Sequence, residues 1–115
     1  MITPDFSAYA VGVDAHFSQP QRSAEVQHLV ENLLTKITLA CVEAGADLIG
    51  HIKSVTETEG KGFLASSVTE PTGLVRSRGE LRDGIDEIEV VINVLLYGLE
   101  RSQVSGIVDG VIKRE

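Results

Sequence analysis

Four basic or titratable side chains alternate along two stretches of the chain that are predicted to be β-strands. His51 and Lys53 are two residues apart, and so are Arg76 and Arg78. Successive side chains of a strand point to opposite faces, so each pair projects from one face. Guanidinium and ammonium groups on one face suit a carboxylate or phosphate group. The sequence therefore predicts an anion-binding site made of His51, Lys53, Arg76 and Arg78. The alternative is a solvated sheet face on which Arg78 pairs with a carboxylate across the strands.

Other chemistry-bearing residues give weaker patterns. Asp14 and His16 would lie on one side of a strand, as an acid–base pair, as half of a metal site, or as chance neighbours on the surface. His16, His28 and His51 lack ligand-like spacing, so no metal site and no cofactor are expected. The lone cysteine, Cys41, falls on the apolar stripe of a predicted helix and is expected to be a small buried hydrophobe. The sequence contains no phosphate loop and no nucleophile with a partnered base.

The elements that must position these residues follow from apolar periodicity. From Val26 to Ala44, apolar residues recur at steps of three and one, which predicts a helix of about 26 residues. We expect it to begin within Ser18–Gln21, where Ser18 can cap it, and to end at Gly45. A second amphipathic helix is predicted over 100–115.

Four strands are predicted between the two helices, over 47–58, 63–69, 74–82 and 85–97. The Asp83-Gly84 pair before the fourth strand is typical of a two-residue hairpin turn. We therefore expect an α+β fold in which one long helix packs on a four-stranded antiparallel meander. A short strand over 8–17 is a further expectation.

The Asp83-Gly84 hairpin would pair Arg78 with Glu89 and place Arg76 and Arg78 on the face opposite the helix. A first turn centred on Gly60 brings His51 and Lys53 to that same face. A slip of one residue would move them to the core face. Because burying Lys53 without a partner is costly, we favour the first register.

Composition bounds the function classes. A chain of 115 residues predicts one domain, 1–115. Its net charge of −7 argues against binding nucleic acid or an anionic membrane surface. Met1–Ala10 shows no basic region or apolar run of signal length, and the apolar stretch 90–96 is too short to span a bilayer. A cytoplasmic location is expected.

Two features predict self-association into a homo-oligomer. The fourth strand is apolar on both faces, so its outer face needs a cover, either the last helix or a second subunit. Gly106 and Gly110 lie four residues apart on the last helix, where each glycine costs about 1 kcal/mol relative to alanine. Another backbone is expected to approach there, from this chain's own sheet or from another subunit.

The later half of the chain resembles the C-terminal domain of CobW-like GTPases. The similar residues are the stretch Gly73–Gly79 with its two arginines, the apolar strand ending in Tyr97-Gly98, the closing helix, and Gly50–Lys53. The likeness covers at most 48–112. The phosphate loop and Cys-x-Cys-Cys motif of those GTPases are not in this sequence. The resemblance thus implies a stand-alone accessory domain for metal or cofactor handling, not a GTPase.

Two functional hypotheses follow. The first is a homo-oligomeric binding or assembly module. The second is a small enzyme with a site between subunits, which uses His51, Lys53, Arg76 and Arg78 on an anionic metabolite. Convergence of His51 and both arginines in one concave pocket would favour the enzyme, whereas a flat, solvated arrangement would disfavour it.

Overall fold

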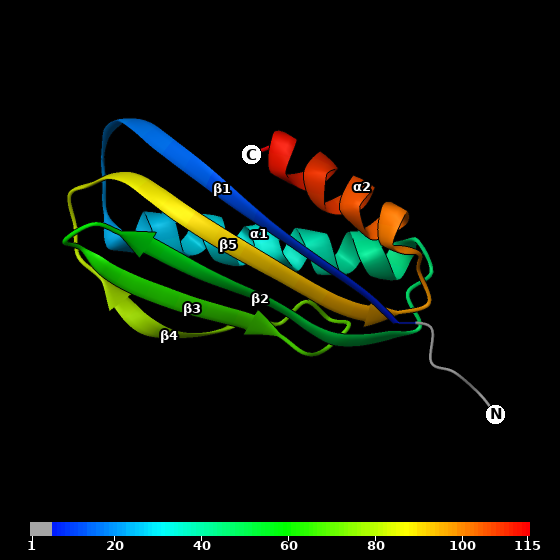
Figure 1. Ribbon diagram of the computed structural model, residues 1–115. Coiled ribbons are helices and arrows are strands. Elements are labelled where there is room, and N and C mark those ends of the chain that lie inside the picture. Colours follow the sequence, from blue (N-terminus) through cyan, green and yellow to red (C-terminus); the bar gives the residue numbers. More distant parts are fainter. Residues whose placement is uncertain (1–5) are drawn as a thin grey trace.

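The computed structural model describes residues 6–115, so the first five positions of the Met1–Ala10 stretch lie outside the described residues. It confirms the α+β class, with two helices and a five-stranded antiparallel sheet (Figure 1). The elements in chain order are β1 (Phe6–Gln21), α1 (Ser23–Glu43), β2 (Leu48–Thr58), β3 (Gly62–Val68), β4 (Arg76–Leu81), β5 (Ile85–Tyr97) and α2 (Arg101–Lys113).

The strand order in the sheet is β1-β5-β2-β3-β4. Strands β2, β3 and β4 follow one another as predicted, but β5 returns to lie beside β2, which makes a Greek key. The predicted continuous meander is therefore wrong in its last step. The N-terminal strand is also longer than expected, because β1 pairs with β5 from Phe6↔Tyr97 to His16↔Glu87 and again at Gln21↔Ile85.

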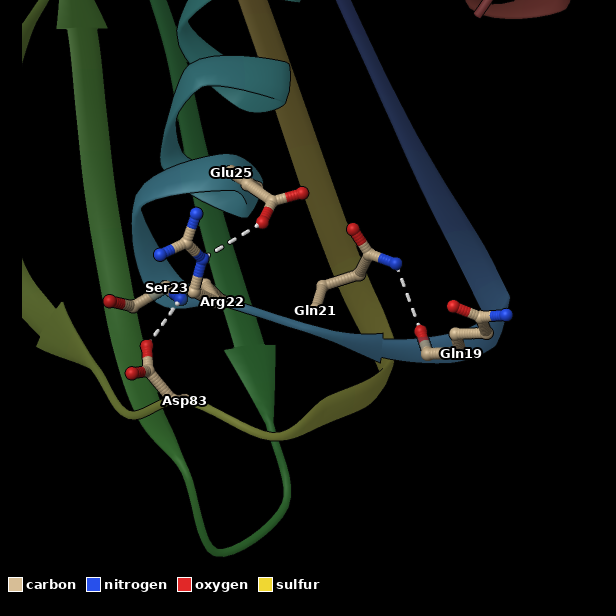
Figure 2. A network of polar contacts seen from close by, with 6 residues as sticks. All are labelled: Gln19, Gln21, Arg22, Ser23, Glu25 and Asp83. Atoms are coloured by element: carbon tan, nitrogen blue, oxygen red, sulfur yellow. Dashed lines mark hydrogen bonds and ion pairs between the residues drawn. The ribbon is translucent and has the colours of Figure 1, made fainter.

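The connection from β4 to β5 crosses the end of the β2–β3 hairpin and does not form a hairpin of its own. The Arg82 backbone N–H donates to the Lys61 carbonyl at 2.8 Å. Farther along, the Gly84 N–H donates to the Gln21 carbonyl at 3.1 Å, and Asp83 Oδ1 accepts the Ser23 N–H at 2.8 Å (Figure 2). Gly84 has the positive φ, 87°, that its sequence context indicates, but its partners are distant in the chain.

Helix α1 begins at Ser23, later than predicted, because β1 continues through Gln21. Ser18 therefore caps nothing. Asp83, from the β4–β5 connection, supplies a carboxylate to the first turn, and Arg22 pairs with Glu25 at 3.2 Å (Figure 2). The C-terminus is as predicted, since Gly45 has φ 111°.

The hydrogen bonds after α1 are those of a Schellman motif. The N–H of Gly45 donates to the Val42 carbonyl at 3.1 Å, and the N–H of Ala46 donates to the Cys41 carbonyl at 3.0 Å. These two bonds satisfy carbonyls that would otherwise lack partners at the helix end.

Both helices lie on one side of the sheet (Figure 1). Helix α1 contacts β2 and β3, whereas α2 contacts β1 and α1. Fully buried side chains such as Leu34, Ile37, Ile52 and Ile92 fill the space between the layers, and each contributes roughly 1.5–3 kcal/mol. The buried residues form one hydrophobic cluster.

Helix α2 is held at the β1 edge. The Tyr9 hydroxyl donates to Asp109 Oδ1 at 2.9 Å, and Arg101 Nε donates to the Ala8 carbonyl at 3.3 Å. The last helix thus covers the same face as α1 and leaves the outer face of β5 uncovered by any described element. None of the described helices has the length and apolar character needed to cross a membrane.

Candidate functional site

The outer face of the sheet brings three of the four predicted site residues together. Lys53 on β2 stands opposite Ser67 on β3, which stands opposite Arg76 on β4. In the next row, Ala65 on β3 stands opposite Arg78. Small residues on the middle strand therefore separate the long cationic side chains. Lys53, Arg76 and Arg78 line one groove of about 280 Å³, which we call the cationic groove.

The cations of this groove have no ion-pair partner among the described residues. The ion pairs within residues 6–115 are His16–Glu87, Arg22–Glu25 and Lys36–Glu115, and none of them includes a residue of the groove. The predicted pairing of Arg78 with Glu89 is wrong, because β3 and β2 separate β4 from β5. Cross-strand pairing within the chain thus does not account for these arginines.

His51 lies on the outer face, two residues before Lys53, but it does not line the groove. A β-bulge between Ile49 and His51 places it there, opposite Leu95. Gly50 allows the bulge, because a Cβ at this position would lie 2.9 Å from the Leu95 carbonyl oxygen. Partial burial, with a smaller contribution from the Lys53 charge, lowers the pKa of His51. A His51 side chain that stays neutral at pH 7 adds no charge to the site.

A second hollow, of about 630 Å³, lies at the end of the same face where β2 meets the β2–β3 turn. His16 Nδ1 lies 3.2 Å from Glu87 Oε2 at its rim. The other acidic residues that line it are Asp14 on β1, Glu57 on β2, Glu59 in the β2–β3 turn and Glu89 on β5.

The spacing of Asp14 and His16 in the sequence indicates one part of this hollow, but it does not predict these glutamates. Their signal was the two-residue spacing of Glu57 with Glu59 and of Glu87 with Glu89. No group of three or more described His, Cys, Asp or Glu side chains is arranged to hold a metal ion.

The remaining candidates take no part in either hollow. Cys41 is fully buried, and burial raises the pKa of its thiol to about 11. A Cβ on Gly106 would meet nothing within 4 Å, so α2 does not use this glycine to approach its own sheet. Of the two alternatives for Gly106, close packing on this chain's own sheet is therefore wrong, and approach by another subunit stays a prediction.

Comparisons with known proteins yield structural matches alone. No family model matches the sequence, and no curated protein matches it. Two solved structures of the YjiA GTPase, a CobW-family GTPase, do match: a Zn(II)-bound triple mutant and the Zn(II)-bound protein from E. coli.

Each match covers 91% of this chain and 30% of the other, at 16% identity, with TM-scores of 0.39 and 0.37. Both matched proteins belong to the family that the sequence resembles. The chain spans less than a third of the length of those GTPases, and a likeness this distant carries no argument about activity.

Proposed function

We propose that this chain is a binding and assembly module whose cationic groove takes an anionic group. The observation that carries the proposal is the set of three cations, Lys53, Arg76 and Arg78, that face one groove without an acidic partner in the described chain. On a protein of net charge −7, such a cluster is a local exception. A bound anion would offset the mutual repulsion of the three charges.

The dimensions and chemistry of the groove favour a small anionic group such as a carboxylate or phosphate. A groove of about 280 Å³ lies just below the range of about 300–1,000 Å³ that small-molecule sites occupy. Two guanidinium groups present planar forks of N–H donors that match carboxylate or phosphate oxygens. The Ser67 hydroxyl lies in the row between Lys53 and Arg76 and can contribute a further hydrogen bond.

Location, oligomeric state and biological role are parts of the same proposal. We place the module in the cytoplasm as a homo-oligomer, in line with its sequence. The sequence resemblance suggests an accessory role in metal or cofactor handling. The rival hypothesis of an enzyme acting on an anionic metabolite requires His51 beside both arginines, and His51 lies outside the groove.

Thermal unfolding in the presence of phosphate or citrate tests the proposal. A ligand that binds only the folded state raises the melting temperature, and at ten times its Kd it adds about 1.4 kcal/mol of stability. We expect this shift in the wild type and its loss in Arg76→Ala/Arg78→Ala. The control Lys113→Ala/Arg114→Ala removes the same charge from exposed positions near the end of α2 and should keep the shift.

Chloride at equal ionic strength separates binding from general screening. A wild-type shift no larger than that of chloride contradicts the proposal. So does an equal shift in the groove variant and in the wild type.

A further inference from the structure

The outer face of the sheet exposes apolar side chains along its whole length. Among the described residues, five of the seven exposed large hydrophobic side chains lie on this face; the other two, Leu39 and Leu74, lie elsewhere. The five are Phe6, Leu48, Val55, Phe63 and Val91. Exposed apolar side chains gathered on one face are a feature of interaction surfaces.

On this face, cationic and acidic side chains occupy different rows across the strands. Lys53, Arg76 and Arg78 occupy two adjacent rows near the middle, which we call the basic rows. The next rows toward the β2–β3 turn carry carboxylates, and we call them the acidic rows. Their members are Asp14, Glu57, Glu80, Glu87 and Glu89. The face therefore carries two patches of opposite sign side by side.

The size of the face fits a stable protein–protein contact. Five strands about 4.8 Å apart, with roughly ten residues of about 3.3 Å each, cover on the order of 800 Å², which is the largest area that a face-to-face contact could bury. A standard interface buries about 800 Å² of each partner.

We propose that a second copy of this chain covers the outer face, and that its acidic rows supply the carboxylates for the cationic groove. The two sheets stack face to face, with a two-fold axis that crosses the strands between the basic and acidic rows. This inference rests on the proposed function, since it names the partner of the same groove.

The direction of the axis follows from the charge pattern. An axis parallel to the strands would place each row over the same row of the second copy, so the carboxylates of the acidic rows would face one another. An axis across the strands exchanges basic rows for acidic rows and makes both halves of the contact attractive. It also places the apolar residues Val55 and Val91 beside the axis, where the second copy covers them.

Charge reversal combined with sedimentation tests this arrangement. The variant Arg76→Glu/Arg78→Glu leaves Lys53 as the one cation of the basic rows, and Glu57→Lys/Glu89→Lys makes two positions of the acidic rows basic. We expect the wild type to sediment at twice the chain mass at micromolar concentration, and each variant alone to sediment as a monomer. An equimolar mixture of the two variants should restore the dimer, because basic then faces acidic in both halves.

The control Lys113→Glu/Arg114→Glu changes the net charge by the same amount as the acidic variant, but on α2. It should remain dimeric. Circular dichroism of each variant confirms that its fold is kept, and the milder pair Arg78→Glu and Glu57→Lys repeats the mixing test if either double variant unfolds.

The outcomes separate the two proposals. A wild type that stays monomeric at every concentration, or a mixture that does not reassociate, overturns the dimer even if phosphate shifts the melting temperature. Conversely, restored dimers in the mixture support the face-to-face contact even if no free anion binds the groove.

Discussion

Two buried hydroxyl groups on the inner face of β2 have no hydrogen-bond partner among the described residues. They belong to Ser54 and Thr56, which are 2% and 0% exposed. Leaving a buried hydroxyl unpaired costs about 1–3 kcal/mol, whereas an apolar group of the same shape avoids this cost. The core beneath α1 thus contains unpaired hydroxyl groups that lower the stability of the fold, and one substitution can remove such a group.

We predict that Thr56→Val raises the free energy of unfolding by about 1 kcal/mol, measured by urea denaturation. The matched control is Thr38→Val, because the Thr38 hydroxyl is equally buried but donates to the Leu34 carbonyl at 2.9 Å. That variant should gain nothing. A loss of stability in Thr56→Val would show that the Thr56 hydroxyl has a partner in solution.

At the scale of elements, the β4–β5 connection ties together segments that are far apart in the sequence. Asp83 accepts the Ser23 N–H at the start of α1, where a negative charge is favourable. This backbone hydrogen bond lowers the pKa of the Asp83 carboxyl below its ordinary value of 3.8. A depressed pKa means that the ionised form stabilises the fold. That stability is present above pH 3.8 and is lost as the pH falls through the folded-state pKa.

Asp83→Ala should therefore lower the melting temperature at neutral pH, and the difference from the wild type should shrink once the pH is well below 3.8. Asp83→Asn keeps an acceptor oxygen without the charge, so it should retain part of the stability, and its difference from Asp83→Ala should not change with pH. A difference between Asp83→Ala and the wild type that is equal at both pH values would contradict the role of the ionised carboxylate.

Local elements could be predicted from the sequence, and their order in the sheet could not. The period of apolar residues located β2, β3, β5 and α2 to within two residues of the structure at each end. Register from the Gly60 turn also placed Lys53 on the outer face, as observed. The Asp83-Gly84 pair led to a wrong strand order. Gly84 has the expected positive φ, but the hydrogen-bond partners of the pair, Gln21 and Ser23, are about sixty residues away in the chain.

For the candidate site too, the features that depend on neighbouring strands in the sequence could be predicted, and those that depend on the strand order could not. Lys53, Arg76 and Arg78 converge because β3 lies between their strands, which the predicted β2–β3–β4 meander anticipated. The pairing of Arg78 with Glu89 failed because it depended on β4 lying beside β5. The acidic hollow was missed because its residues come from three strands, and two of these pairings, of β1 and of β2 with β5, were not predicted.

At the scale of the whole molecule, two surfaces remain candidates for self-association. One is the outer face of the sheet, and the other is the face of α2 that contains Gly106 and Gly110. Both helices lie on the opposite side of the sheet from the outer face, so the two surfaces can be altered independently (Figure 1). The charge pattern and area favour the sheet, whereas an exposed helical glycine is by itself a destabilising choice.

We predict that Gly106→Ala raises the free energy of unfolding by roughly 0.5–1 kcal/mol, because a Cβ at this position meets nothing within 4 Å. Gly106→Leu should leave the sedimentation of the wild type unchanged, while Val91→Glu on the outer face should shift it to the monomer. Both substitutions are at exposed positions, so each variant should keep its fold. If Gly106→Leu dissociates the protein and Val91→Glu does not, the subunits meet through α2 and the sheet remains exposed to solvent.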